Sequence, residues 1–226
     1  MTNNTIIVVD SDFHILADDH EALAMLAPAH RAGKLKIAGV TVVTGNTWTH
    51  VSEQHARYAL ENLAFGDSVP VHPGATQPLL HRQKDFVHRS RIYGAAFGGA
   101  WGRSTLLRDD IVSVKVPAPG AVSYHAANFI ADLATMSETP ITIVAIGPLT
   151  NIALALRLRS DIVGNIERVI TMGGAFHVPG NVTPSAEFNW WFDAEAAAIV
   201  LESGLAIDVI PLDATDSLSF DIDRYR

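Results

Sequence analysis

Apolar runs alternate along the chain with segments whose apolar positions recur every three or four residues. Runs rich in β-branched residues predict strands at 6–9, 36–43, 69–71, 141–146, 167–172 and 206–211. Helical periodicity predicts helices from 18 to about 27 and at 51–65, 122–136, 149–158 and 194–203. Because strands and helices alternate, we expect an α/β fold with an open, mostly parallel, Rossmann-like sheet and helices on both faces.

The pattern predicts one domain over residues 1–226, since no repeat, low-complexity tract or linker divides the chain. Between residues 78 and 119 the periodicity weakens, and glycines alternate with aromatic residues. A long segment of this composition is typical of a functional loop or lid.

Four carboxylates gather where the first strand ends and the first helix begins: Asp10, Asp12, Asp18 and Asp19. The carboxyl edge of an open α/β sheet is where ligands bind. Crowded carboxylates repel one another unless a cation or ligand hydroxyls compensate, so the cluster indicates a hard metal ion. The plainer alternative is that Asp18 is a helix N-cap, completed by Glu21, that Asp19 favours the helix dipole, and that Asp10 and Asp12 belong to a loop.

Composition narrows the classes of function. The formal net charge of −8 argues against a surface for nucleic acid or anionic membrane. The chain has no cysteine, which excludes thiolate metal sites. Its first residues lack the features of a signal peptide, and no apolar run approaches the roughly 20 residues of a membrane helix. We therefore expect a soluble, cytoplasmic protein.

Several short blocks, in this order, resemble the nucleoside hydrolase family of inosine–uridine-preferring N-ribohydrolases. They are Asp10-Ser11-Asp12 with Asp18-Asp19, Thr44-Gly45-Asn46, Gly147-Pro148-Leu149-Thr150-Asn151, Met172-Gly173-Gly174-Ala175-Phe176, Gly180-Asn181-Val182-Thr183-Pro184, Glu187-Phe188-Asn189 and Asp193-Ala194-Glu195-Ala196-Ala197. The resemblance covers the chain from residue 6 to about 213. It implies hydrolysis of the N-glycosidic bond of a ribonucleoside to free base and ribose, as in purine and pyrimidine salvage.

The resemblance also implies a calcium site. Asp12 and Asp19 would bind Ca²⁺ together with the backbone carbonyl of Ile146, and Asp10 would support the cluster. A carbonyl at the end of a strand, just before Gly147-Pro148, is physically suited to this role. Asp12 would further act as the general base for a calcium-bound water.

A second set of residues is implied to bind the substrate: Asp18, Asn46, Asn181, Glu187 and Asn189 would hold the ribose hydroxyls, and Met172 would pack near the sugar. Carboxylates and amides match hydroxyls as acceptors and donors. Glu187 and Asn189 are two residues apart, so an extended segment would point both to one side and Phe188 to the core. Taken alone, Asn46 and Asn181 are more typical of turns than of a binding site, because each adjoins a glycine.

The sequence departs from the family pattern in three places. The linker 13–17 is longer than usual, and residues 86–102 lack the motif from which base preference would be inferred. Family members also continue into a segment with a His-Asp pair that completes the calcium site, so we expect this chain, ending at Arg226, to be short at its C-terminus. We expect the short C-terminus to leave apolar surface uncovered and therefore to favour homo-oligomers. The resemblance implies the same, since family members are commonly dimers or tetramers.

Two alternatives remain open from the sequence. In the first, the chain has the same fold and binds ribose or nucleosides without turnover, because the His-Asp segment is missing. Alternatively, a strand followed by Asp10-x-Asp12 is typical of haloacid-dehalogenase-like phosphatases, although that reading leaves Asp18-Asp19 and the later blocks unexplained.

Overall fold

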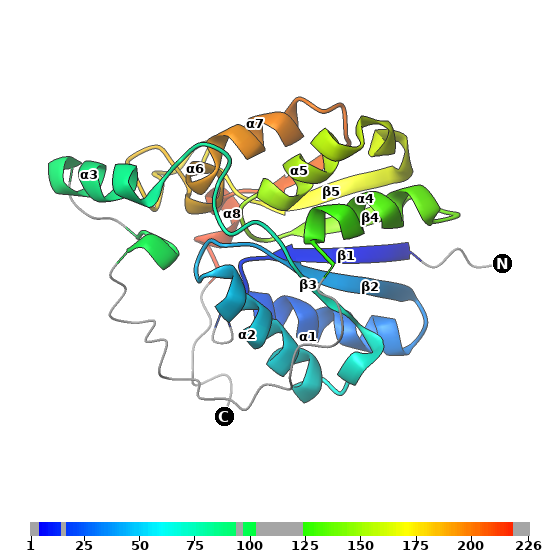
Figure 1. Cartoon of the computed structure of the whole chain (residues 1–226). Coiled ribbons are helices and arrows are strands. Elements are labelled where there is room, and N and C mark those ends of the chain that lie inside the picture. The colour runs from blue at the N-terminus through cyan, green and yellow to red at the C-terminus, as the bar shows by residue number, and fades with distance from the viewer. Residues whose placement is uncertain (1–4, 15–16, 94–96, 103–123, 219–226) are drawn as a thin grey trace.

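The strands form one parallel sheet, as the alternating pattern predicts. The computed structural model describes residues 5–14, 17–93, 97–102 and 124–218. Within these ranges the strand order is β3-β2-β1-β4-β5-β6 (Figure 1). The strands are β1 (Thr5–Ser11), β2 (Leu35–Val42), β3 (Val71–Pro73), β4 (Ile141–Ala145), β5 (Ile166–Met172) and β6 (Ile207–Ile210).

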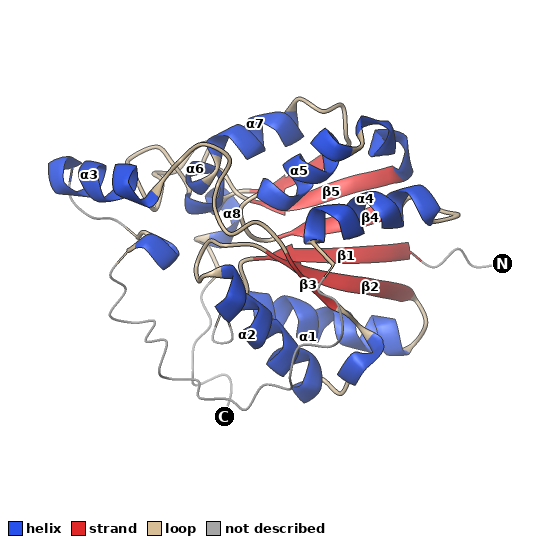
Figure 2. Cartoon of the chain, viewed as in Figure 1, coloured by secondary structure: helices blue, strands red, loops and turns tan. Residues whose placement is uncertain are grey.

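Helices cover the sheet from both sides (Figure 2). They are α1 (Asp18–Arg31), α2 (Thr49–Asn62), α3 (Gln83–Tyr93), α4 (Ala126–Met136), α5 (Thr150–Leu158), α6 (Phe188–Phe192), α7 (Ala194–Leu201) and α8 (Leu212–Thr215), with 3₁₀ turns at Gly66–Ser68, Gly99–Trp101 and Ser160–Asn165. The helices α1 and α2 pack on one face over β1 to β3, whereas α4, α5 and α7 pack on the other. None of the helices in the described ranges is long and apolar enough to cross a membrane.

The central strand β1 is apolar on both sides because each side faces a layer of helices. Val8 belongs to the core beneath α4, α5 and α7, whereas Ile7 and Val9 belong to the core beneath α1 and α2. A strand buried on both faces reads as a continuous apolar run rather than an alternating one. This is why Ile6 to Val9 could be recognised as a buried strand.

The order of the strands reverses at β1. From β1 the chain moves to β2 and β3 on one side, then returns to place β4, β5 and β6 on the other. Such a switch point opens a crevice at the carboxyl ends of the strands, where ligands bind. The backbone N–H of Ile146, just past β4, donates to the carbonyl of Asp10 in β1 at 2.9 Å. The two neighbouring strand ends are therefore tied together beside this crevice.

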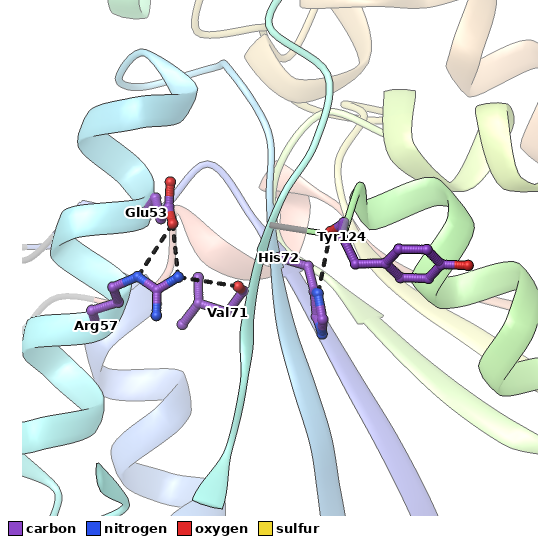
Figure 3. A network of polar contacts seen from close by, with 5 residues as sticks. All are labelled: Glu53, Arg57, Val71, His72 and Tyr124. Atoms are coloured by element: carbon purple, nitrogen blue, oxygen red, sulfur yellow. Dashed lines mark hydrogen bonds and ion pairs between the residues drawn. The ribbon is translucent and has the colours of Figure 1, made fainter. Parts of the chain in front are cut away.

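The edge strand β3 is held from both layers (Figure 3). Arg57 of α2 is paired with Glu53 and also donates to the carbonyl of Val71 at 3.4 Å. On the other side, Nδ1 of His72 lies 3.2 Å from the carbonyl of Tyr124, and the His72 ring stacks on Phe129 of α4 at 3.9 Å between centroids. These contacts give a three-residue strand partners beyond its ladder with β2.

Several boundaries differ from those predicted. The prediction that Asp18 is the N-cap of α1 was wrong: the cap is Ala17, no side chain caps the helix, and Asp18 is its first residue. A helix, α3, and a 3₁₀ turn lie in the segment predicted to be a lid, of which residues 94–96 and 103–123 lie outside the described ranges. The short helix α6 lies where the periodicity predicted no helix, and the side chain of Glu187 caps it.

The double-sided core gives a first prediction. Ile143 in β4 is fully buried in the core beneath α4, α5 and α7. Ile143→Ala should lower the free energy of unfolding by about 2–5 kcal/mol, because it removes buried methyl groups and leaves a cavity. Urea denaturation measures this. Met136→Ala, at a residue that is 80% exposed, is the control and should change stability little. Equal losses in the two variants would contradict this description of the core.

Candidate active site

Three of the four clustered carboxylates are buried at the carboxyl edge of the sheet. Asp10, near the end of β1, and Asp12, just after that strand, have no exposed surface. Asp19 in α1 is 1% exposed. Asp18, the fourth, is exposed. Buried carboxylates are rare unless they are paired, hydrogen-bonded or bound to a metal. The partners of each group therefore decide what the cluster does.

One oxygen of Asp10 accepts two hydrogen bonds, whereas the other accepts none from the described residues. Its Oδ1 accepts hydrogen bonds from the hydroxyl of Thr41 at 2.5 Å and from Nδ2 of Asn151 at 2.8 Å. Its Oδ2 is buried and has no hydrogen-bond partner among the described residues. Burial raises the pKa of Asp10 to about 6, and the two donated hydrogen bonds oppose that rise.

Asp12 has the same asymmetry. Its Oδ2 accepts the backbone N–H of Asn46 at 2.5 Å, whereas Oδ1 is buried without a partner in the part of the chain that is described. Burial raises the pKa of Asp12 well above its usual value, and the negative charge of Asp19 raises it further. Gly45 is required here, because a Cβ at that position would overlap the Asp12 side chain.

Asp19 is tied to the same strand end. Its Oδ1 accepts from the hydroxyl of Ser11 at 2.5 Å, and its Oδ2 accepts from the backbone N–H of His14 at 2.9 Å. Burial, followed by the charge of Asp18, raises the pKa of Asp19 to about 7. These bonds explain why α1 begins where it does without a capping side chain: the acid in its first turn binds the preceding loop instead.

The cluster offers oxygen donors to a cation. The unpartnered Oδ2 of Asp10 and Oδ1 of Asp12 are the kind of oxygen that a hard metal ion satisfies. A cation would also offset the repulsion that raises the pKa of Asp12 and Asp19. Over the described ranges, however, no group of three or more His, Asp or Glu side chains is arranged to hold a metal. The donor chemistry therefore fits a cation, although these side chains alone do not enclose one.

Glu187 has a structural role that sequence reasoning did not predict. Its carboxylate accepts the backbone N–H groups of Gly174, Asn189 and Trp190 at 3.0, 2.7 and 3.1 Å, so it caps α6 and fastens the turn after β5. The predicted extended segment was therefore wrong, because Asn189 lies inside a helix. Phe188 is buried, as expected. Burial raises the pKa of Glu187.

Asn189 joins the ends of two strands. Its Nδ2 lies 3.3 Å from the carbonyl of Ile146 after β4 and 3.2 Å from the carbonyl of Met172 in β5, and it also contacts the Met172 sulfur at 3.4 Å. Three residues predicted from different blocks of the sequence are thus brought together. The carbonyl of Ile146 faces this amide at the same strand end that contacts Asp10.

The remaining predicted residues lie around these two groups. Asn46 is half-buried and contacts Asp12 through its backbone. Asn181 is exposed, and its Oδ1 accepts the backbone N–H of Phe188 at 2.8 Å, which links it to the start of α6. Asp18 acts on the cluster through its charge, which raises the pKa of both Asp12 and Asp19.

Three polar residues in the site were missed by sequence reasoning: Ser11, Thr41 and Asn151. Each is fully buried and donates to one of the carboxylates. The signal for Thr41 was a polar side chain between Val40 and Val42, near the end of a strand. Asn151 lies within the Gly147–Asn151 block, so its position was noted but its partner was not.

Comparison with known proteins decides the family. A family profile described as inosine-uridine preferring nucleoside hydrolase matches residues 7–226. The chain belongs to the nucleoside hydrolase family. This membership replaces the phosphatase alternative, and it agrees with the blocks on which the resemblance was based.

Individual nucleoside hydrolases are similar to the chain over most of its length. It is 33% identical to probable uridine nucleosidase 1 of Oryza sativa subsp. japonica, over 95% of the chain and 60% of that protein. It is 34% identical to the pyrimidine-specific ribonucleoside hydrolase RihB of Escherichia coli O17:K52:H18, over 88% of the chain and 57% of that protein. Among solved structures, a plant nucleoside hydrolase, PpNRh1, has a TM-score of 0.71 and 29% identity, over 95% of this chain and 62% of that one.

A further structure supports the fold alone. The inosine-guanosine nucleoside hydrolase IG-NH has a TM-score of 0.75 at 23% identity and covers 98% of this chain and 64% of that one. In each of these comparisons the chain spans about three fifths of the length of its relative.

The buried carboxylates give a second prediction, for the protein without metal. Asp10 and Asp19 have higher pKa values in the folded than in the unfolded chain, so the folded state binds protons more tightly. The free energy of unfolding should therefore fall as pH rises from about 4 to about 7. Asp10→Asn should remove up to about 3 kcal/mol of that fall, because its pKa is raised by roughly two units.

Urea denaturation at several pH values in a chelator measures this slope. Asp208→Asn, at an exposed position, is the control and should leave the slope as it is. Stability that rises with pH over this range would show that the buried carboxylates do not titrate as described.

Proposed function

We propose that the chain hydrolyses the N-glycosidic bond of ribonucleosides and releases free base and ribose. The observation that carries the proposal is the buried Oδ1 of Asp12, which has no hydrogen-bond partner among the described residues, while the backbone N–H of Asn46 holds Oδ2 at the carboxyl edge of the sheet. The family supports the same reaction, since relatives are named uridine nucleosidase and ribonucleoside hydrolase.

We propose calcium as the metal, held by Asp12, Asp19 and the carbonyl of Ile146, with Asp10 adding negative charge. Oxygen donors of this kind suit a hard cation. When bound, calcium would lower the pKa of a water molecule beside the anomeric carbon and would orient the sugar. The position of Oδ1 of Asp12 supports its role as general base, because this buried oxygen accepts no hydrogen bond from the described residues and is open to a proton from that water.

The sugar would lie between the carboxylates and the start of α6. Asp18, Asn46, Asn181, Glu187 and Asn189 are the proposed partners of the ribose hydroxyls, and Met172 would pack beside the ring. Hydroxyl contacts that strengthen as the sugar gains oxocarbenium character would lower the barrier, which equal binding of substrate and transition state cannot do. Glu187 would act mainly by ordering this segment, because its carboxylate already accepts three backbone N–H groups.

The second candidate function is binding of ribose or nucleosides without turnover. Two observations favour it: both oxygens of Asp19 are already hydrogen-bonded, and no group of three metal-binding side chains is arranged within the described ranges. The two candidates differ in one measurable respect, because only the first releases ribose.

The test is ribose release by the purified chain. With calcium and a panel of purine and pyrimidine ribonucleosides, reducing sugar should appear, and a chelator should abolish it. Asp12→Asn should slow the reaction by about 10²- to 10⁴-fold, the usual contribution of a general base. Asp161→Asn, a surface carboxylate paired with Arg159, is the control and should retain activity. Nucleoside or ribose binding without ribose release would favour the second candidate.

Three further proposals follow from the sequence and the family: a single domain, a homo-oligomer and a cytoplasmic location. Light scattering of the purified chain would determine its oligomeric state. The panel of nucleosides would determine base preference, for which the relatives differ in name between pyrimidine and purine.

A further inference from the structure

The Gly147–Asn151 block is a marked feature of the sequence, but the proposed chemistry uses only the carbonyl of Ile146, which precedes it. The block leads from β4 into α5, and the first two residues of α5, Thr150 and Asn151, are both buried. Each side chain crosses to a different carboxylate: Thr150 donates to Asp193 at 2.6 Å, and Asn151 donates to Asp10 at 2.8 Å. Only the second of these carboxylates belongs to the site.

The amide of Asn151 connects three parts of the sheet edge. Its Nδ2 donates to Oδ1 of Asp10 in β1 and to the carbonyl of Val42, the last residue of β2, at 3.1 Å. Its Oδ1 accepts the backbone N–H of Ala75, shortly after β3, at 2.8 Å. Both hydrogens of the amide are used, so the side chain has one orientation in which all three partners are satisfied.

The fit around this amide is tight. Asn151 has no exposed surface, and a Cβ at Gly74 would overlap its side chain. A buried amide with every donor used is costly to disturb, because each partner would be left without a hydrogen bond. This one side chain therefore bonds to the ends of β1 and β2 and to the segment after β3.

The strand ends held by Asn151 carry the residues of the site. Asp12 follows Asp10 by two positions, and Asn46 follows Val42 by four, with its backbone N–H on Asp12. Because Asn151 donates to Oδ1 of Asp10, the other oxygen of this carboxylate is the one left without a hydrogen bond. That oxygen is the buried Oδ2, which has no partner among the described residues. Thr41 also orients Asp10, since its hydroxyl donates to the same Oδ1.

We propose that Asn151 is a positioning residue that orients Asp10 and sets the distance between the strand ends bearing Asp12 and Asn46, and so tunes the affinity of the site for calcium. This inference rests on the proposed function, because it assumes that the carboxylates bind calcium. The Asn151 side chain bonds to Asp10, Val42 and Ala75, so it would act on the metal through these partners. Partners that orient metal-binding groups typically change metal affinity by about 10- to 100-fold when they are removed.

The experiment measures calcium affinity by titration calorimetry on the full chain, alongside melting temperature in a chelator. Asn151→Ala should weaken calcium binding by about tenfold or more. Thr41→Val removes the other donor to Asp10 and keeps the bonds of Asn151 to Val42 and Ala75. It should also weaken calcium binding, but by less. Thr150→Val is the matched control, because it loses one buried bond to a carboxylate from the same helical turn.

A purely structural role would lower the melting temperature of all three variants and leave calcium affinity alone, so wild-type affinity in folded Asn151→Ala would overturn the inference. If Asn151→Ala does not fold, Thr41→Val decides, and unchanged affinity there would overturn it. The inference would also be overturned if Thr150→Val weakened calcium binding as much as Asn151→Ala does. Failure of the wild-type chain to bind calcium would overturn both this inference and the proposed metal, whereas binding that is insensitive to Asn151 would remove the inference alone.

Discussion

Burial of three carboxylates at one end of a parallel sheet is the constraint on which the rest of the structure depends. An unpaired charge in such a place is strongly unfavourable, and it is tolerated only where hydrogen bonds or a cation compensate. The chain supplies hydroxyl, amide and backbone donors to one side of Asp10 and Asp12 and to both oxygens of Asp19. Within the described part of the chain, one buried oxygen of Asp10 and one of Asp12 are left without a hydrogen-bond partner.

Close backbone approach is the second condition for this arrangement. Gly45 and Gly147 lie against Asp12 from the ends of β2 and β4, and a Cβ at either position would press on its side chain or backbone. The glycines therefore serve less to make turns than to let neighbouring strand ends approach an acid. Their place in the sequence, directly after apolar strands, follows from the place of the acid at the sheet edge.

The fold could be predicted because it depends on local periodicity. A strand buried on both faces and helices with an apolar stripe are visible in the sequence, and Asp193, directly before the helix predicted at 194–203, caps α7 by accepting the N–H of Ala196. The partners of Asp10 could not be predicted in this way, because Thr41 and Asn151 reach it only through the tertiary fold. The extended conformation expected for Glu187 failed for a related reason: its carboxylate found three N–H groups that periodicity does not reveal.

The hydrogen bond between Asn151 and Asp10 joins residues that are 141 positions apart in the chain. Contacts of such sequence separation form late in folding, because the loop between them must first close. The carboxylates therefore receive their full set of donors only when the start of α5 has docked on the sheet. If the site binds a metal, a chain with only its first three strands in place would bind it more weakly, because it would lack the amide that holds Asp10.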